Sequence, residues 1–370
     1  MSHNGNIPAL SVEQAVTQLS DSYIAAISAG LSPKHLPSVM LWGPPGVGKS
    51  QAVRQLALEI EEQTKKRCHI TDVRLLLFNP IDLRGIPTAN EDKTLAVWLK
   101  PQIFQMDESD EVVNLLFLDE ISAAPQSVQA AAYQITLDRV VGEHRLPDNC
   151  IVIAAGNRVT DRSVAFKMPR ALANRLCHIE IKSNFDSWKS WAVRNGINEK
   201  VVGFLSFRPD LLMENSEMTK DDLAYPTPRS WEMVSRYLNY VNGDVEKLQP
   251  LIAGCVGVGV ATELRTYCRI YATLPKIEDI FLGKPAEMPK SGDALYALIS
   301  AMTSYAREHK DEQGKIRNSI LFACKMPVDY SAVLMKSYMA IEKGYREKLM
   351  KIPEFYKWMQ TKGRHLNGVV

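Results

Sequence analysis

The segment VMLWGPPGVGKS, at residues 39–50, decides how this chain is expected to fold. Its first four residues are apolar and predict a short buried strand. A loop of glycines and prolines follows and ends in Lys49 and Ser50, where apolar side chains begin to recur on one helical face. A strand, a glycine-rich loop and a helix in this order form a P-loop, in which backbone N–H groups and a helix N-terminus surround phosphate oxygens.

The residues of this loop have separate physical roles. The glycines let the backbone turn its N–H groups inward, Lys49 is expected to reach the β- and γ-phosphates, and the Ser50 hydroxyl is expected to ligate Mg²⁺. A glycine-rich turn that binds nothing is the alternative, but the strand before the loop and the helix after it disfavour that interpretation. The residues expected to bind the nucleotide are Gly43, Pro44, Pro45, Gly46, Val47, Gly48, Lys49, Ser50 and Gln51.

Four further apolar runs alternate with amphipathic stretches. Continuous apolar strands that alternate with helices predict an α/β fold, with a parallel five-stranded sheet covered by helices on both faces. From about residue 183 the strand pattern fades, and the rest of the sequence predicts helices. The four runs are LLLF (75–78), LLFL (115–118), IVIAA (151–155) and HIEI (178–181).

Polar side chains follow two of these runs. Asp119 and Glu120 come directly after residues 115–118, and Asn157 follows residues 151–155. Ligands of open α/β sheets bind at the carboxyl ends of the strands. We therefore expect Asp119 to hold Mg²⁺ and Glu120 to polarise an attacking water. Asn157 could hold that water against the γ-phosphate, although asparagine is also common in turns.

The chain is expected to divide into four parts. A helix predicted over residues 11–30, with Ser11 as its N-cap and Gly30 just past its end, precedes the sheet. The last part carries no motif, and its apolar residues at helical spacing must be buried against something. The expected parts are an N-terminal helix and lead-in (1–38), an α/β nucleotide-binding core (39–183), a helical domain (184–275) and a connector with a C-terminal helical region (276–370).

The composition excludes several classes of protein. Among 370 residues, 44 Lys and Arg stand against 42 Asp and Glu, so the net charge of +2 creates no strong field toward nucleic acid or membranes. The longest nearly apolar stretch, residues 251–261, is too short to span a bilayer, and the N-terminus predicts no signal peptide. Six scattered cysteines without a CxxC pair argue against zinc and disulfides and favour the cytoplasm.

These motifs, in this order, resemble those of an AAA+ ATPase. Further segments resemble the MoxR branch, within the group that carries a pre-sensor hairpin. FNPIDLRGIP (78–87) resembles an insertion of this branch, RVVGEHRLPDNCIVIAAGN (139–157) resembles the hairpin and the strand after it, and Asn157 matches sensor 1. The resemblance covers about residues 10–275, and Trp42, directly before the P-loop, departs from the family's pattern.

Two arginines are assigned through the same resemblance. MPRALANRLCHIEI (168–181) resembles the segment that carries the arginine finger, with Arg175 at the finger position and Arg170 as a competitor for that role. Alternatively, Arg175 pairs with a carboxylate at the end of the last strand. TPRSWE (227–232) resembles the sensor 2 motif at the start of a lid helix, with Arg229 as the sensor; an exposed surface arginine is the alternative.

The resemblance also implies an activity and an assembly. It implies strand order 5-1-4-3-2 with the P-loop strand central, Mg–ATP hydrolysis, and a homo-oligomeric ring, expected to be a hexamer, in which Arg175 completes the neighbour's site. The implied client is a protein that the ring remodels or activates, and members of this branch often act with a von Willebrand factor A domain protein. Related rings translocate nucleic acid, but residues 139–146 lack a dense basic stripe, which favours a protein client.

Overall fold

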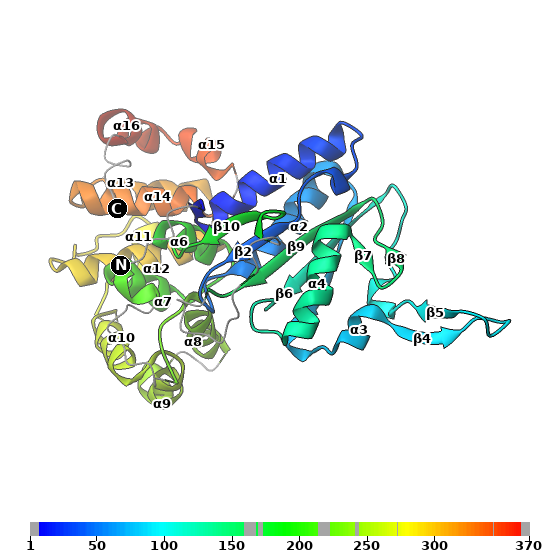
Figure 1. Cartoon of the computed structure of the whole chain (residues 1–370). Helices are drawn as coiled ribbons and strands as arrows, with labels where there is room; N and C mark the ends of the chain where they lie inside the picture. Colours follow the sequence, from blue (N-terminus) through cyan, green and yellow to red (C-terminus); the bar gives the residue numbers. More distant parts are fainter. Residues whose placement is uncertain are drawn as a thin grey trace. The chain divides into compact units, whose positions relative to one another are not determined.

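The computed structural model of the chain separates into two compact units, which meet in the sequence between Ser183 and Asn184 (Figure 1). The first is an α/β unit, and the second contains only helices and loops among its described residues. The strand pattern of the sequence ends at the same boundary. The residues that the structure describes are 7–158, 168, 173–213, 223–240, 244–271, 273–342 and 344–363.

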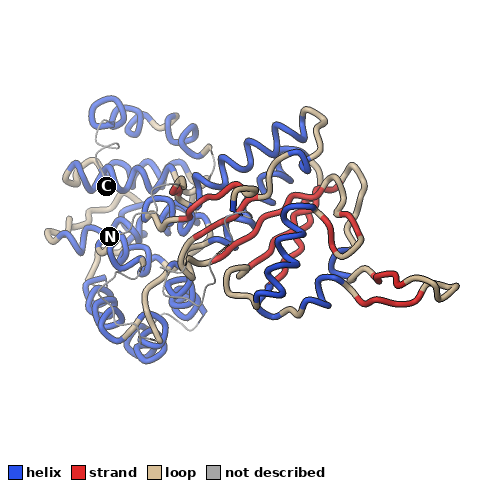
Figure 2. The backbone as a smooth tube through the Cα atoms, viewed as in Figure 1, coloured by secondary structure: helices blue, strands red, loops and turns tan. Residues whose placement is uncertain are grey.

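A six-stranded sheet forms the centre of the α/β unit, and all neighbouring strands in it are parallel (Figure 2). From one edge to the other the strands are β1 (Ala9–Leu10), β10 (Cys177–Ile181), β2 (Val39–Trp42), β9 (Cys150–Gly156), β6 (Val112–Asp119) and β3 (Arg67–Arg74). Without β1, this is the predicted order 5-1-4-3-2. The P-loop strand β2 therefore lies inside the sheet, between β10 and β9.

Two features of the sheet correct the sequence prediction. The strand expected at residues 75–78 is largely a 3₁₀ turn, η2 (Leu75–Leu77), and the second strand, β3, lies directly before it. β3 forms an outer edge and is mostly exposed or half-buried, so it lacks the continuous apolar run that identifies an inner strand. The sixth strand, β1, has two residues, which are too few to show a pattern.

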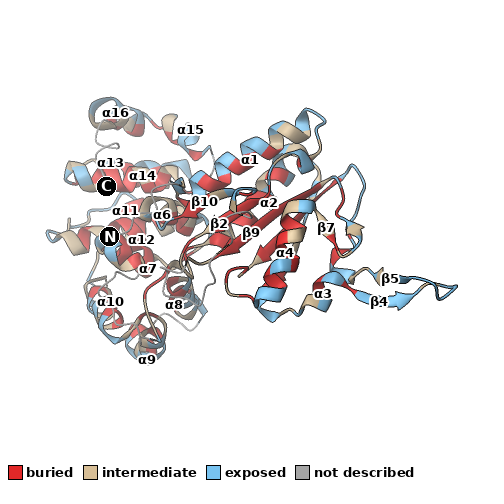
Figure 3. Ribbon diagram, in the orientation of Figure 1, coloured by how far each residue is buried: buried red, intermediate tan, exposed pale blue. Residues whose placement is uncertain are grey.

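Helices cover both faces of the sheet (Figure 3). On one face α1 (Val12–Ser28) and α2 (Lys49–Thr64) contribute side chains such as Ile60 to a core with the inner strands. On the other face α4 (Gln126–Asp138) packs its apolar side, including Val128, against the alternate strand residues. Because inner strands are buried on both faces, their carboxyl ends are held in fixed positions for the side chains that follow them.

The N-terminal helix begins where the sequence predicts. The Ser11 hydroxyl accepts a hydrogen bond from the Gln14 N–H at 3.2 Å, and the Gln14 side chain accepts one from the Ser11 N–H at 3.0 Å. This reciprocal pair is a capping box, which satisfies two backbone donors of the first turn. The helix ends at Ser28, just before Gly30, whose φ of +70° suits a glycine.

Hairpins interrupt two connections of the sheet (Figure 1). Between the second and third strands of the predicted sheet, α3 (Pro80–Arg84) leads into the antiparallel hairpin of β4 (Ile86–Ala89) and β5 (Ala96–Leu99). The segment at residues 78–87, which resembles an insertion, therefore leads into a hairpin. The remaining short elements of this unit are β7 (Val140–Val141) and β8 (His144–Arg145), which form a hairpin before β9, and the turns η1 (Pro33–His35) and η3 (Gln102–Phe104).

The second unit is a set of helices around one hydrophobic core. Its elements are α6 (Phe185–Arg194), α7 (Glu199–Phe207), η5 (Pro209–Leu212), α8 (Pro228–Tyr240), α9 (Val245–Val256), α10 (Val258–Tyr271), α11 (Ile277–Phe281), α12 (Gly292–Glu308), α13 (Gln313–Ala323), α14 (Val328–Met339), α15 (Tyr345–Met350) and α16 (Pro353–Lys362). Within the described residues, none of the helices is long and apolar enough to cross a membrane.

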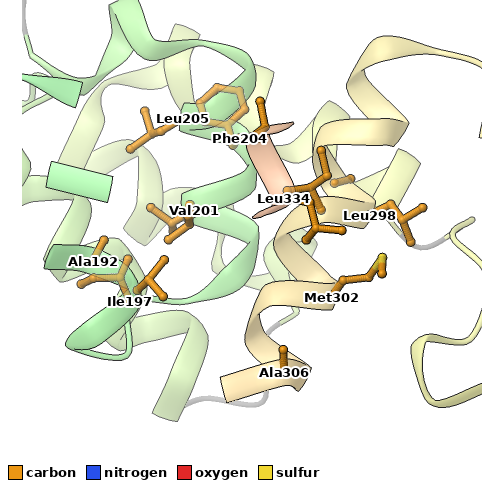
Figure 4. Packing of buried hydrophobic residues seen from close by; sticks show 14 of the residues in the cluster. Ala192, Ile197, Val201, Phe204, Leu205, Leu298, Met302, Ala306 and Leu334 are labelled. Atoms are coloured by element: carbon orange, nitrogen blue, oxygen red, sulfur yellow. The ribbon is translucent and has the colours of Figure 1, made fainter. Parts of the chain in front are cut away.

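The core of the helical unit runs from Trp188 in α6 to Trp358 in α16. Figure 4 shows part of it, where Phe204 of α7, Leu298 of α12 and Leu334 of α14 are buried together. The same core therefore includes helices on both sides of residue 275, where the sequence suggested a division. A separate lid and C-terminal region remain a prediction.

Candidate functional site

The loop between β2 and α2 depends on glycine at several positions. φ is +155° at Gly43, +78° at Gly46 and +109° at Gly48, values that other residues rarely adopt. A Cβ atom at Gly43 would also lie only 2.7 Å from the carbonyl oxygen of Ile181. Gly48, the N-cap of α2, has no side chain that could accept a hydrogen bond from the first N–H groups of the helix. These donors therefore remain available to a phosphate in the loop.

The Lys49 side chain is buried inside this loop. Its Nζ donates hydrogen bonds to the carbonyl oxygens of Gly43, at 2.5 Å, and Pro44, at 3.1 Å. A third hydrogen bond, of 2.8 Å, reaches Oδ1 of Asn157 at the end of β9. A buried ammonium group needs such oxygen acceptors, because burial removes its hydration. The structure thus joins the lysine of the P-loop to the amide predicted to lie beside the γ-phosphate.

The second contact of the site joins α2 to β6. Ser50 Oγ donates a hydrogen bond of 3.1 Å to Oδ2 of Asp119, the last residue of β6. A hydroxyl and a carboxylate oxygen are hard ligands of the kind that Mg²⁺ prefers. The donor set therefore fits the metal that the P-loop implies, and these two residues are the ones predicted to hold it.

Glu120 occupies an unusual backbone conformation. Its φ is +58°, in the left-handed region that disfavours side chains, and its N–H donates to Asp119 Oδ1 at 2.9 Å. The chain is fixed again at the next residue, because the Ile121 N–H donates to the carbonyl oxygen of Ala155 at 3.0 Å. The carboxylate of Glu120 is thereby turned out of the strand direction immediately beyond Asp119. Non-glycine residues with such φ values are concentrated at functional sites.

Asn157 is held by a residue that the sequence analysis missed. Its backbone N–H donates to the hydroxyl of buried Ser122 at 2.8 Å. The preceding residue must be small, because a Cβ atom at Gly156 would lie 2.8 Å from both Ser122 Oγ and Met40 Cε. The Ser122 hydroxyl therefore fixes the backbone of the residue whose amide contacts Lys49. A serine two positions after Glu120 carries no sequence signal that separates it from an ordinary turn residue.

A further acid lies near the expected metal position on β3. The pKa of Asp72 is raised from its ordinary 3.8, first by burial and then by the negative charge of Asp119, while Arg74 and Arg54 act in the opposite direction. Asp72 lies on the strand next to β6, two residues before Arg74, the register partner of Asp119. A divalent cation bound at Asp119 would reduce the effect of that negative charge on Asp72. Sequence reasoning missed Asp72 because it placed this strand one segment too late.

The two predicted arginines are both exposed. Arg175 follows the described residues Ala173 and Asn174 and lies just before β10, whereas Arg229 is the second residue of α8 in the helical unit. Arg170, the competitor for the finger role, falls outside the described residues. The assignments of all three arginines remain predictions.

The carboxylate at the end of the last strand has another partner. Glu180 is buried in β10 and forms an ion pair with Arg158, and Lys182 Nζ lies 3.7 Å from the same oxygen of Glu180. The alternative in which Arg175 pairs with a carboxylate of this strand therefore gains no support from Glu180. The sequence analysis did not single out Glu180, because it interpreted the run HIEI as apolar. The polar residues His178 and Glu180 alternate with Ile in this run.

The side chains at the carboxyl ends of β2, β6 and β9 form one polar site. It combines the cation of Lys49, the oxygens of Ser50 and Asp119, the carboxylate of Glu120 and the amide of Asn157. Phosphoryl transfer requires a cation for the phosphate charge, oxygen ligands for a metal, and a group that orients water. The site contains a residue suited to each requirement.

Residues 38–178 match the sequence model of the family described as ATPase family associated with various cellular activities (AAA). The match spans β2, β6 and β9, which carry the site, and it ends inside β10. The α/β unit is therefore similar to the ATPase domain of this family, and the similarity supports nucleotide binding and ATPase activity in general. The helical unit lies outside the match, and none of the curated proteins matches the chain.

Solved structures with a similar fold include PCH-2 of C. elegans, at 15% identity over 68% of this chain and 67% of that chain, with a TM-score of 0.34. A RuvB mutant of Thermotoga maritima has 18% identity over 81% of this chain and 86% of its own, with a TM-score of 0.35. NtrX from Brucella abortus, in complex with ADP, has 13% identity over 95% and 68%, with a TM-score of 0.37.

Proposed function

We propose that this protein is a MoxR-type AAA+ ATPase that hydrolyses Mg–ATP and uses the reaction to remodel or activate a protein partner. One observation carries the proposal: the Lys49–Asn157 and Ser50–Asp119 contacts gather the predicted site residues at the carboxyl ends of three adjacent strands. A P-loop that served only as a turn would not need a buried lysine held by an amide from β9.

The residues of the chain divide the chemistry between them. Lys49 stabilises negative charge on the β- and γ-phosphates, Asn157 orients the attacking water, and Glu120 polarises it. Mg²⁺, held by Ser50 and Asp119, would neutralise phosphate charge. The left-handed backbone at Glu120 supports its role, because non-glycine residues with such φ values are concentrated at functional sites.

The active species in this proposal is a homo-oligomeric ring, expected to be a hexamer. Arg175 of one subunit completes the site of its neighbour, where it stabilises charge that develops on the γ-phosphoryl group. The exposure of its side chain supports this role, because a finger that acts on a neighbouring subunit has to be accessible. Arg229 serves as sensor 2 on a helical lid.

The client is proposed to be a protein in the cytoplasm, and a von Willebrand factor A domain protein is a candidate partner. The hairpin of β4 and β5 exposes apolar side chains, among them Ile86 (60%), Leu95 (67%) and Leu99 (57%). Nucleic-acid binding would instead require a basic surface interleaved with aromatic side chains. The exposed apolar hairpin thus supports the choice of a protein client.

The Glu120→Gln variant tests the proposal. It should bind ATP like the wild type and lose about 10²–10⁴-fold in turnover, because it removes water activation and leaves the metal ligands intact. Glu108→Gln, the same substitution at an exposed acid of the same unit, serves as the control and should hydrolyse ATP normally. Equal turnover of the two variants would contradict the role of Glu120. Because it binds ATP without hydrolysing it, the Glu120→Gln variant should also retain its protein client in a pull-down from cells.

A further inference from the structure

Trp42, the last residue of the P-loop strand, is joined to β10 by a side-chain hydrogen bond. Its indole Nε1 donates to Nδ1 of His178 at 2.9 Å. The two rings are stacked, with centroids 6.0 Å apart and an angle of 22° between their planes. Trp42 directly precedes Gly43, so this bond attaches β10 to the strand end from which the phosphate-binding loop starts.

The bond determines the tautomer of the imidazole. An indole N–H can only donate, so Nδ1 of His178 must accept and carries no proton. The proton of the neutral ring is therefore on Nε2, which lies 2.7 Å from the carbonyl oxygen of Ala173 and donates to it. Both nitrogens of the ring are thus used, one toward the P-loop strand and the other toward the segment before β10.

The Ala173 carbonyl closes the turn that carries Arg175. It also accepts a hydrogen bond of 3.3 Å from the Leu176 N–H, so Arg175 lies inside a four-residue turn that ends at Leu176. Leu176 is buried in a hydrophobic core of the α/β unit, and the next N–H, of Cys177, donates to the carbonyl oxygen of Ser38 at 3.0 Å. The exposed arginine is therefore held from both sides, by a buried leucine after it and by the His178 contact before it.

We propose that His178 is a positioning residue, which holds the Arg175 turn in the orientation that its role in the neighbouring site requires. This inference rests on the proposed function, because it assumes that Arg175 acts as the finger. The backbone of His178 is fixed in the sheet, where it lies opposite Met40 of β2. The bond from Trp42 leaves Nδ1 as the acceptor and Nε2 as the donor, and the bond from Nε2 holds the Ala173 carbonyl.

Two substitutions at the same position separate the two contacts. In His178→Asn the side-chain oxygen can take the place of Nδ1 and accept from Trp42, but the side chain is too short to reach Ala173. In His178→Gln the amide nitrogen lies near the place of Nε2 and can donate to Ala173, but the bond to Trp42 is lost. Both variants lose the aromatic ring, so their loss of packing is matched.

The expected results differ between the variants. His178→Asn should lower the kcat for ATP hydrolysis by about 10–100-fold, as small misplacements of a catalytic group do, with ATP affinity unchanged. His178→Gln should retain turnover close to that of the wild type. The proposal is overturned if the two variants have equal kcat values, or if the asparagine variant loses ATP affinity instead of kcat.

Mixed rings show which site His178 serves. Lys49→Ala subunits keep an intact Arg175 turn but cannot bind ATP productively. Mixed with His178→Asn subunits they should restore turnover, because interfaces then form between an intact P-loop and a correctly held arginine. If mass measurement shows mixed rings without recovery, His178 acts on the P-loop of its own subunit through Trp42, and the proposal is wrong.

Arg175→Ala, measured in parallel, distinguishes a failure of the finger assignment of Arg175 from a failure of the positioning role of His178. If this variant hydrolyses ATP like the wild type, the finger assignment in the proposed function fails. If it is inactive while His178→Asn is fully active, only the positioning role of His178 fails. Thermal unfolding of both His178 variants checks that neither result arises from loss of the fold.

Discussion

The two units of the chain use buried polar groups in opposite ways. In the α/β unit, Lys49, Asp119 and Asn157 converge at one edge of the sheet, with hydrogen bonds among themselves and their neighbours. In the described residues of the helical unit, buried polar atoms are dispersed: some bond in isolated pairs, such as Tyr338 Oη with Ser319 Oγ, and others, such as Trp188 Nε1, have no hydrogen-bond partner, as is also true of Asn114 Oδ1 in the α/β unit. A gathered, mutually satisfied polar set marks a site, whereas dispersed polar atoms accompany a packing core.

This difference also explains which part of the chain could be interpreted from sequence. Each polar residue of the α/β site comes after an apolar strand. Its position in the sequence therefore places it at the carboxyl edge of the parallel sheet. The helical unit buries large side chains such as Trp231 and Phe355 in one core, and amphipathic spacing says only that they are buried. Changes at the polar site of the first unit should therefore affect chemistry, and changes in the buried core of the second should affect stability.

The largest effect is expected from Lys49→Ala. It removes a charge-assisted phosphate contact and leaves the acceptor atoms around it without their donor, so ATP affinity should fall by about 10²-fold or more and hydrolysis should cease. Isothermal calorimetry with Mg–ATP measures the affinity. Lys66→Ala, in the loop after the same helix, is the control and should bind normally. Unchanged affinity of the Lys49 variant would remove the basis for a nucleotide site.

The next largest effect is expected from Arg175→Ala. The variant should bind ATP like the wild type but hydrolyse it about 10³-fold more slowly, because only charge that develops during the reaction loses a partner. A mixture with Lys49→Ala should recover some turnover, measured by phosphate release, if the arginine acts on the neighbouring subunit. A mixed ring that stays inactive would rule out action in trans and make Arg170 the next candidate.

In the helical unit, Leu298→Ala should change stability and leave nucleotide binding alone. Leu298 is fully buried in α12 within the core that α7 shares, so truncation should lower the free energy of unfolding by about 2–5 kcal/mol. Leu251→Ala, at a residue 48% exposed, should change it by less than about 0.5 kcal/mol. Urea unfolding followed by circular dichroism measures both. Loss of ATP affinity in the Leu298 variant would contradict the separation of roles.

The inner strands and the polar residues that follow them were predictable because continuous apolar runs and fixed motif spacing both report local structure, whereas the order of the strands was implied by the family resemblance. The edge strand β3 was missed because exposure on an outer edge allows polar residues such as Arg67 and Asp72. Ser122 and His178 were missed for another reason. Ser122 contacts the backbone of Asn157 and His178 contacts the ring of Trp42, both far away in the sequence, and no local pattern predicts such partners.

The smallest effect is expected at Lys189, a half-buried residue of α6. Burial lowers the pKa of its ammonium group from 10.5 to about 8, with Asp186 acting in the opposite direction and Lys336 adding to the decrease. Between these two pKa values the unfolded chain binds a proton that the folded chain does not, so this group makes stability rise with pH across that range. Below about pH 8 the cost of burying the charge is fully present.

Lys189→Met should remove this cost. The variant should therefore be more stable than the wild type at pH 7, by about 1 kcal/mol or less after screening by solvent, and the gain should shrink as the pH rises toward 10.5. Lys247→Met, at a side chain 85% exposed, should show no such pH dependence. Urea unfolding at pH 7 and pH 10 compares the two. A gain that is equal at both pH values would mean that the added apolar surface, and not the buried charge, stabilises the variant.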